Sequence, residues 1–447
     1  MIDTTICYIG GGSADWAVKL MRDLALQDEI RGELRLYDID RGAAELNRDL
    51  GGRLFRHERA RSSFAVTVAD ELPEALDGAD VVIVSIEPGP TELREGDLEI
   101  PARYGILQTV GDTTGPGGAL RAWRAVPVFV DFATQIARHA PDAWVINYTN
   151  PMTVCTAALF EGFPGIKAVG CCHEVPALRG EMTRFFDGRL EGFSQETADL
   201  DLDVCGINHF TFCSRMTRAG RDLLPELRQY ARSAESQVDR SAAAADRRRE
   251  RRWFDNDHLI AVEFLRRFDA LGFAGDRHLA EFVPWFLGSN EELERYGTIV
   301  TPYWWRKERN EARADRDPAR EAADLTPSGE EGVDMIRALV GGTAVRTNVN
   351  VPNGGQIPWL PMGHPVETFA RISPDTITPE TPATIPEAAR ALVRRAADQQ
   401  RLVLAASLER NEDLLLSAVL ADPLVHLPAT ETEHMVREML AHQASRE

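Results

Sequence analysis

The sequence has 447 residues, of which 44% are hydrophobic and 27% are charged. This length accommodates two or three ordinary domains, and the composition is typical of a soluble globular protein. The formal net charge of −20 argues against nucleic acid as a partner, because an acidic surface repels polyanions. No apolar run reaches the length of a membrane span, so no membrane partner is expected.

The chain begins with a strand-like segment that lacks the basic stretch and apolar core of a secretory signal. Its cysteines are sparse and lie mostly in strand-like apolar runs, which does not resemble a secreted disulfide framework. They are Cys7, Cys155, Cys171, Cys172, Cys205 and Cys213. We therefore expect reduced thiols and a cytoplasmic location.

The first third of the chain alternates apolar strands with helices. Strand-like runs cover residues 4–11, 32–40, 64–70, 79–89, 142–151 and 165–172, and residues 16–26 have helical spacing of apolar residues. Continuous apolar strands separated by helices predict a doubly wound parallel sheet that is covered on both faces. We expect an α/β protein whose first domain spans residues 1–175.

After residue 175 the pattern becomes mixed α+β. Helical spacing covers 178–186, 257–271, 332–339 and 388–406, and strand-like runs cover 201–212 and 344–353. We expect residues 176–447 to form a second domain for substrate, metal and oligomerisation. Residues 231–252, rich in Ala, Arg, Ser and Asp, predict a lid or an exposed helix. The basic run at 246–255 is interpreted as a solvated face.

A glycine-rich turn follows the first strand. Gly10, Gly12 and Ser13 precede a helix, an arrangement that brings backbone N–H groups and a helix N-terminus to a pyrophosphate. Asp38 ends the second strand, where a carboxylate binds a ribose 2′-hydroxyl and favours NAD over NADP. The third glycine of the usual motif is replaced by Asp15. This turn predicts a Rossmann-like coenzyme site; a purely structural turn, with Asp38 as a helix cap, is the alternative.

Polar residues follow three later strands. Asn150 ends one strand, Cys172 and His173 follow the next, and His209 lies in a later strand-like run. Ligands of open α/β sheets bind at the carboxyl ends of the strands, so Asn150 and Cys172 are expected to face one cleft. A thiolate and an imidazole suit a divalent transition metal, and two protein ligands leave positions open for substrate oxygens. Taken singly, each residue is equally compatible with a structural role.

The stretch from Gln108 to Val128 is a further signature. Gly115, Gly117 and Gly118 open a helix, and Arg121 and Arg124 follow in its first turns. This arrangement suits a second loop that faces an anion or substrate, or a loop that needs glycine only for its shape.

Together these motifs resemble glycoside hydrolase family 4, whose members are NAD- and divalent-metal-dependent glycosidases. The resemblance follows the chain in order through GGGS, YDID, GDTTGPGGALRA, NYTNPM, CCHEV, GINHF, HLAEFVPWF and TNVNVPNGGQIPWLP. Cys-His after the Val-Gly strand end is similar to the α-galactosidase and α-glucosidase branch, whereas phospho-glycosidases typically carry Cys-Asp or Cys-Asn there. An unphosphorylated sugar is therefore favoured.

The resemblance also implies roles for residues. Cys172 would be the metal thiolate and His209 its imidazole partner, with Mn²⁺ as the usual ion, while Asn150 and Arg94 would bind the substrate. His173 would donate a proton to the leaving group. Better-known members use a tyrosine as the general base near the position of HLAEFVPWF, where this chain has Phe282, so His278 is our candidate base.

The activity implied by the resemblance is hydrolysis of an α-linked, unphosphorylated glucoside or galactoside by a homodimer or homotetramer. It would proceed by NAD-dependent oxidation at C3, deprotonation at C2, elimination, water addition and re-reduction. An α-uronidase of the same family is one alternative, in which Arg94, Arg121 and Arg124 would pair with a carboxylate. An NAD-dependent dehydrogenase of a sugar, polyol or hydroxy acid and a non-catalytic NAD-binding regulator are the others.

Overall fold

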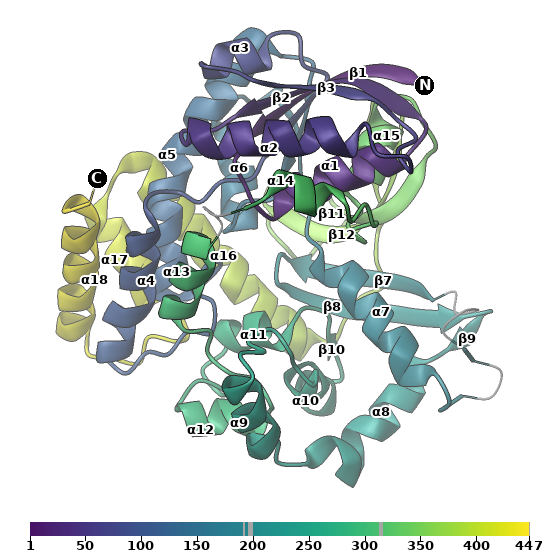
Figure 1. Ribbon diagram of the computed structural model, residues 1–447. Helices are drawn as coiled ribbons and strands as arrows, with labels where there is room; N and C mark the ends of the chain where they lie inside the picture. The colour runs from purple at the N-terminus through teal and green to yellow at the C-terminus, as the bar shows by residue number, and fades with distance from the viewer. Residues whose placement is uncertain (191–192, 195–199, 313–315, 447) are drawn as a thin grey trace.

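The computed structural model describes residues 1–190, 193–194, 200–312 and 316–446. A parallel sheet forms its amino-terminal half, with the strand order β3-β2-β1-β4-β5-β6 (Figure 1). Its strands are β1 (Ile2–Ile9), β2 (Ile30–Tyr37), β3 (Phe64–Val68), β4 (Val81–Val84), β5 (Trp144–Asn147) and β6 (Lys167–Gly170). The connecting helices are α1 (Trp16–Leu26), α2 (Arg41–Leu54), α3 (Leu72–Leu76), α4 (Thr91–Arg103), α5 (Gly115–His139) and α6 (Met152–Gly162).

Both faces of this sheet are covered by helices. Along β1, Ile6 and Tyr8 point into a core shared with α1 and α2, and Cys7 and Ile9 point into a core shared with α5 and α6. Successive strand residues face opposite sides, so a strand buried on both faces needs an uninterrupted apolar run. The predicted α/β class with a doubly wound amino-terminal sheet is confirmed.

The second half of the chain continues the same sheet with antiparallel strands. β11 pairs with both β6 and β12, and β7 pairs with both β12 and β8, which gives a 13-stranded sheet. The added strands are β7 (Asp201–Ile207), β8 (Phe210–Arg218), β9 (Arg221–Asp222), β10 (Leu271–Gly272), β11 (Val345–Pro352), β12 (Pro365–Ser373) and β13 (Thr376–Pro379). Helices and strands mix in this half, as expected from the sequence.

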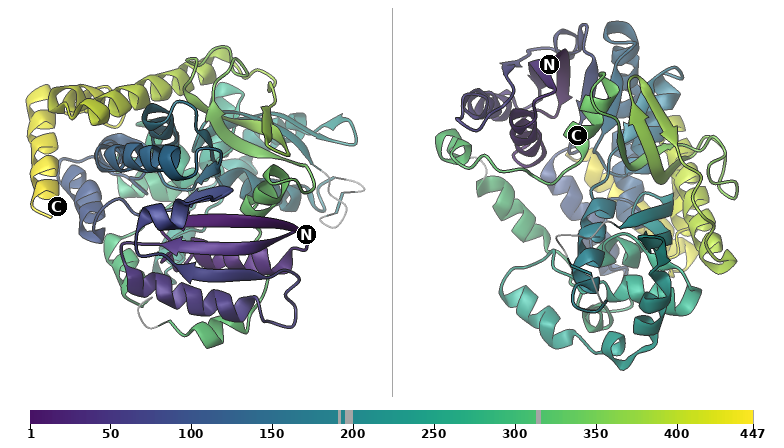
Figure 2. Two further views of the ribbon diagram at one scale, coloured as in Figure 1. Left: turned by 90° about the horizontal axis from the view of Figure 1, so that it is seen from above. Right: turned by 90° about the vertical axis from the view of Figure 1, so that its right-hand side faces the viewer.

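The remaining helices form three groups. Around β7, β8 and β10 lie α7 (Glu174–Phe186), α8 (Leu224–Arg232), η2 (Ala234–Gln237), α9 (Ser241–Arg249), α10 (Leu259–Phe268), α11 (Asp276–Leu279), η3 (Ala280–Phe282) and α12 (Asn290–Arg295). Beside the amino-terminal half lie α13 (Tyr303–Glu311), α14 (Pro318–Ala322) and α15 (Gly332–Leu339). The last three, α16 (Glu387–Glu409), α17 (Glu412–Leu420) and α18 (Ala429–Ala444), stack beside α4 and α5 (Figure 2).

The two halves are therefore intertwined. α14 packs against α2, α15 packs against α1, and β11 joins the edge of the parallel sheet, although all three come from late in the sequence. The domain boundary at residue 175 stays a prediction. Among the described helices, none combines the length and apolarity that crossing a bilayer requires.

Candidate active site

The four residues predicted to bind a coenzyme come together between β1 and α1. Gly10 has φ +90°, and a Cβ atom there would lie 2.0 Å from the Ser85 carbonyl oxygen, so only glycine fits. The Gly12 N–H donates to Asp38 Oδ2 at 2.8 Å, which fixes the carboxylate at the end of β2 beside the turn. Ser13 Oγ accepts the Trp16 N–H at 3.1 Å at the start of α1.

Asn47 on α2 supports this turn and was missed in the sequence. Its side-chain amide donates to the carbonyl oxygens of Gly11 at 2.7 Å and of Ser13 at 2.9 Å.

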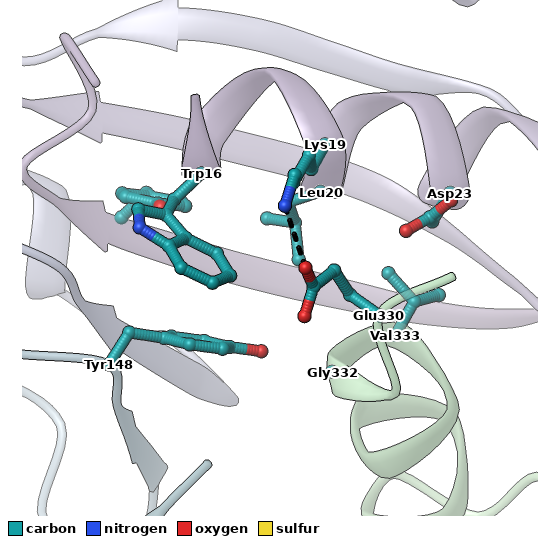
Figure 3. Close-up of a pocket in the computed structure, with 9 residues that line it drawn as sticks. Trp16, Lys19, Leu20, Asp23, Tyr148, Glu330, Gly332 and Val333 are labelled. Atoms are coloured by element: carbon teal, nitrogen blue, oxygen red, sulfur yellow. Dashed lines mark hydrogen bonds and ion pairs between the residues drawn. The ribbon is translucent and has the colours of Figure 1, made fainter. Parts of the chain in front are cut away.

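On the other side of α1, a small cavity of about 10 Å³ lies between α1, Tyr148 and the start of α15 (Figure 3). Lys19 closes it with a 2.7 Å ion pair to Glu330.

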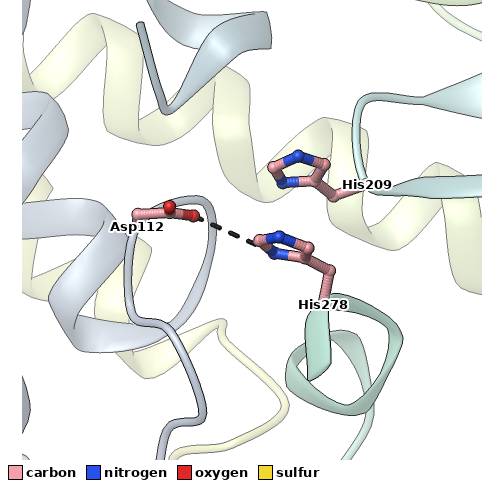
Figure 4. A group of neighbouring side chains, drawn as sticks. All are labelled: Asp112, His209 and His278. Atoms are coloured by element: carbon pink, nitrogen blue, oxygen red, sulfur yellow. Dashed lines mark ion pairs between the residues drawn. The ribbon is translucent and has the colours of Figure 1, made fainter. Parts of the chain in front are cut away.

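Three side chains from distant segments form a candidate metal site. Asp112, from the loop before α5, His209, from the turn between β7 and β8, and His278, from α11, hold ligand atoms that all lie within 4.8 Å of one another (Figure 4). The imidazole rings stack with centroids 3.7 Å apart, and His278 Nδ1 lies 4.0 Å from Asp112 Oδ1. All three are buried, and their oxygen and nitrogen donors suit a divalent transition metal.

Local structure sets the direction of His209. It is the second residue of the two-residue turn between β7 and β8 and has φ +64°, a left-handed conformation that turns its side chain out of the hairpin. Its Nδ1 shares a 2.8 Å hydrogen bond with Thr113 Oγ1, which leaves Nε2 for a further ligand.

Electrostatics favour a bound cation at this group. Burial opposes ionisation of Asp112, but His278, His209 and Arg94 outweigh it and hold its pKa well below the usual range. Burial, aided by His278, lowers the pKa of His209 to about 3, so its imidazole is neutral at neutral pH. Burial likewise lowers the pKa of His278. A carboxylate beside two neutral imidazoles is the protonation state that metal ligation requires.

Cys172 lines the same cavity as this group but is not one of the three. Its side chain is buried, and burial, followed by Glu367 and Glu174, raises its pKa well above 9. Asn348 on β11 donates to the Cys172 carbonyl oxygen at 3.2 Å and to Glu367 at 2.8 Å. Its role as a metal ligand with His209 stays a prediction.

Two histidines flank Glu174. His173 is half exposed, with Nε2 3.9 Å from Glu174 Oε1, whereas His278 is buried, with Nε2 3.7 Å from the same oxygen. Glu174 also accepts the Gly275 N–H. Burial raises the pKa of Glu174, but His278, His173 and His209 outweigh it and lower the value to about 2.

Asn150 and Arg94 both reach Asp112 of the candidate metal site, and their roles in substrate binding stay predictions. Asn150 Nδ2 donates to Asp112 Oδ2 at 3.3 Å, and its Oδ1 is buried without a hydrogen-bond partner among the described residues. Arg94 Nη2 lies 3.8 Å from the same Asp112 oxygen. The free amide oxygen of Asn150 is available to a ligand.

Two expectations for the glycine-rich loop are wrong. Arg121 pairs with Glu87, and Arg124 forms a two-bond pair with Asp97 at 2.9 and 2.5 Å, so both buried guanidiniums are already neutralised and neither lines the cleft. The N-terminus of α5 is also occupied, because Asp422 accepts the Gly115 N–H at 2.9 Å. The residue of this motif that joins the candidate metal site is Asp112, three positions before Gly115.

These groups open into one cleft of about 760 Å³. Its lining includes Asn150, Cys172, His173, His209, His278, Arg94 and Asp112, together with Asp15, Phe254, Arg277, Arg306 and Arg309. The 231–252 segment contains the end of α8, then η2 and α9, and contributes Arg247 to the wall. The predicted metal, proton-transfer and substrate residues are thus brought to one place.

Comparison with known families identifies the protein class. The model of the family 4 glycosyl hydrolases matches residues 5–187, and the model of their C-terminal domain matches residues 204–425. The chain belongs to glycosyl hydrolase family 4. The family 4 relatives include an alpha-galacturonidase of Thermoanaerobacterium saccharolyticum, 40% identical over 98% of this chain and 95% of that protein. An alpha-galactosidase of Bacillus subtilis is 28% identical over 94% of this chain and 92% of that protein.

Solved family 4 structures have the same fold. A crystal structure of the Bacillus subtilis protein LplD, whose name describes it as a glucosidase, matches with a TM-score of 0.89 and 37% identity, covering 98% of this chain and 100% of that one. A 6-phospho-beta glucosidase from Thermotoga maritima, with manganese, NAD⁺ and glucose-6-phosphate, matches with a TM-score of 0.77 and 21% identity over 99% and 98% of the two chains.

Proposed function

We propose that this family 4 enzyme hydrolyses α-linked galacturonides with the help of NAD and a divalent cation, Mn²⁺. The observation that carries this proposal is the 40% identity, over 98% of the chain, to a protein named alpha-galacturonidase. The alpha-galactosidase of Bacillus subtilis, a relative named for a neutral sugar, is 28% identical. This difference favours the uronide alternative over the neutral glucoside or galactoside that the sequence motifs favoured.

The residues of the β1–α1 turn fit a dinucleotide. The turn leaves no room for a side chain at Gly10, and Asp38 stands beside it with its carboxylate fixed by the Gly12 N–H. When bound, NAD supplies a hydride acceptor for the sugar ring. Asp38 would hold the ribose hydroxyls and repel a 2′-phosphate, which favours NAD over NADP.

The residues around Asp112 fit a metal ion. They bring one carboxylate and two imidazoles together, beside buried atoms that lack hydrogen-bond partners in the described structure, including Asn150 Oδ1 and His278 Nδ1. When bound, a divalent cation supplies Lewis acidity to sugar oxygens. We assign His209 as a ligand, with Asp112 and His278 as the partners the geometry favours and Cys172 as the partner the family resemblance favours.

Two histidines are placed for proton transfer. His173 is half exposed at the cleft, so it can reach a leaving group and exchange its proton with solvent. The lowered pKa of His278, caused by burial, keeps its imidazole neutral and able to accept a proton. We propose His173 as the acid and His278 as the base, unless His278 binds the metal. The homodimeric or homotetrameric state and the cytoplasmic location stay predictions.

A substrate panel tests the proposal. The purified enzyme would be assayed with NAD⁺, Mn²⁺ and a reductant on the nitrophenyl α-glycosides of galacturonic acid, galactose and glucose. We expect the highest kcat/KM on the galacturonide and no net formation of NADH. Preference for a neutral glycoside would refute the substrate class, and NADH accumulating with substrate loss would indicate a dehydrogenase.

Metal titrations test the ligands separately from turnover. Asp112→Asn, Cys172→Ser and His278→Gln would be titrated with Mn²⁺ by calorimetry, with unfolding temperatures as the check on folding. A true ligand should lose at least tenfold in Mn²⁺ affinity. If Cys172→Ser binds Mn²⁺ with wild-type affinity, the cysteine is not a ligand. Wild-type affinity of Asp112→Asn or His278→Gln would likewise exclude Asp112 or His278.

A further inference from the structure

Six basic side chains line the cleft, although the chain as a whole carries a formal charge of −20. Four of them are held by carboxylates of the protein. The pairs are Lys19–Glu330 at 2.7 Å, Arg247–Asp257 at 2.8 Å, Arg309–Asp15 at 3.1 Å and Arg94–Glu87 at 3.4 Å. These four cations are therefore largely neutralised before any substrate arrives.

The other two, Arg277 and Arg306, lack such a partner. No carboxylate of the described residues lies within salt-bridge distance of either guanidinium. Arg277 donates to Thr301 Oγ1 at 3.0 Å, and Arg306 Nε is buried without a hydrogen-bond partner in the described part of the chain. Both cluster at Phe254, with guanidinium carbons 4.6 and 6.0 Å from the centre of its ring.

Arg277 and Arg306 destabilise the folded protein while no anion is bound, because two like charges lie near each other and are partly removed from water. Burial lowers the pKa of Arg306 far below 12.5, and Arg94 and Arg277 lower it further. Burial also lowers the pKa of Arg277, although Glu174 and Asp112 partly offset the effect. A partly buried guanidinium that lacks a counter-ion is stabilised by an anion that enters beside it.

We propose that Arg277 and Arg306 bind the C6 carboxylate of the galacturonide and thereby select a uronide over a neutral sugar. This inference rests on the proposed function. A guanidinium offers a planar fork of N–H donors that matches a carboxylate, and Phe254 supports both forks from one side.

The position of the pair fits a sugar that also reaches the metal. Arg277 directly precedes His278, which belongs to the Asp112 group, and Arg94 lies 3.8 Å from Asp112 while acting electrostatically on both Arg277 and Arg306. Arg94 is thus close to the cation site and near enough to both unpaired arginines to affect them electrostatically. A galacturonide would place its ring hydroxyls at the metal and its carboxylate at the pair.

Selectivity, measured as the ratio of kcat/KM on nitrophenyl α-galacturonide to that on the α-galactoside, tests the inference. Arg277→Gln and Arg306→Gln should each lower kcat/KM on the galacturonide by about 10- to 100-fold, the value of a charge-assisted hydrogen bond. Turnover of the galactoside should change by less than about threefold, because a hydroxymethyl group has no charge to pair. Arg306→Lys, which keeps the positive charge, should have a selectivity ratio between those of Arg306→Gln and the wild type.

The matched control is Arg309→Gln. It removes the same charge from the same helix and the same cleft, but from a guanidinium that already pairs with Asp15. For this variant, the ratio of kcat/KM on the galacturonide to that on the galactoside should stay within about threefold of the wild-type ratio, even if both values of kcat/KM change. If Arg309→Gln shifts the ratio as much as Arg306→Gln does, net charge rather than the proposed pair sets selectivity, and the inference is overturned.

The outcomes separate this inference from the proposed function. A wild-type enzyme without galacturonidase activity refutes the proposed function. If the wild type cleaves galacturonides and the arginine variants keep the wild-type ratio of kcat/KM on the two substrates, only the role of the two arginines is refuted. Calorimetry with free galacturonate, in which each variant should lose at least tenfold in affinity, gives the answer if galactoside turnover is too slow to measure. A wild-type preference for a 6-phosphogalactoside would assign the pair to phosphate instead.

Because Arg277 also holds Thr301, its loss can disturb folding. Arg306 donates no side-chain hydrogen bond to another described residue, so Arg306→Gln decides the case if Arg277→Gln is unstable.

Discussion

Replacing Glu281 by Gln should stabilise the enzyme above neutral pH. Glu281 is fully buried, and its Oε1 accepts hydrogen bonds from Val110 N at 2.7 Å, Gly111 N at 2.9 Å and Thr109 Oγ1 at 3.0 Å, while Oε2 has no described partner. Burial raises the pKa of this carboxyl to about 7, from an ordinary value of 4.5, although the N–H donors lower it. The charged form is therefore disfavoured in the folded protein.

The raised pKa of Glu281 predicts how much the substitution should stabilise the protein and over which pH range. A pKa raised from 4.5 to about 7 corresponds to about 3 kcal/mol. Because the folded pKa is the higher one, this contribution to stability is fully present below pH 4.5 and is lost as the pH rises through about 7. Glutamine keeps the acceptor oxygen but cannot ionise. The variant should match the wild type near pH 4.5 and exceed it by up to about 3 kcal/mol at pH 8.

Thermal unfolding followed by circular dichroism at pH 4.5, 6 and 8 measures this difference. The unfolding entropy of a 447-residue chain is about 0.9 kcal/mol/K, so we expect a gain of about 3 °C at pH 8. Glu281→Ala is the control, because it leaves the buried Val110 and Gly111 N–H groups without an acceptor and should lower Tm at every pH. If the wild type is the more stable protein at pH 8, the three donors stabilise the ionised carboxylate more than burial disfavours it, and the reasoning fails.

Three further predictions concern the coenzyme, the core and the acid. Asp38→Ser should weaken NAD⁺ binding and narrow its advantage over NADP⁺ in fluorescence titrations; an unchanged preference would place Asp38 away from the ribose. Arg124→Met should cost about 3–5 kcal/mol, because it leaves Asp97 buried and unpaired, and Tm should fall by about 3–5 °C. His173→Ala should lower kcat by about 10²- to 10⁴-fold without changing Mn²⁺ affinity, whereas a normal kcat would exclude it as the acid.

The parallel sheet could be predicted from the sequence because its signals are local. Each strand from β1 to β6 is a short apolar run followed by a polar turn. The expected ranges contain β3 to β6 and overlap β1 and β2, which both begin two residues earlier than expected. The antiparallel extension could not be predicted, because β11 and β12 pair with strands that precede them by more than 140 residues. Their partners depend on tertiary packing, which no local pattern specifies.

The same limit applies to the cleft. His209 and His278 were singled out because they lie in motifs that resemble the family, and the structure brings them into contact. Asp112 was not predicted as a site residue, because only the glycines and arginines of its loop were considered. An acidic residue next to the glycines was the signal that could have identified it. Arg277 and Arg306 lie on two short helices with no shared motif, and only the folded structure shows that neither has a carboxylate partner among the residues it describes.

The late strands also bear on synthesis at the ribosome. β6 and β7 flank the gap that β11 and β12 fill, so the nascent chain presents two open sheet edges until residues 345–373 emerge. Asn348, which fixes the Cys172 backbone, arrives in the same stretch. A chain released before that point would lack both its central strands and a support of its active site, and its free edges would make it a target for chaperones or proteases.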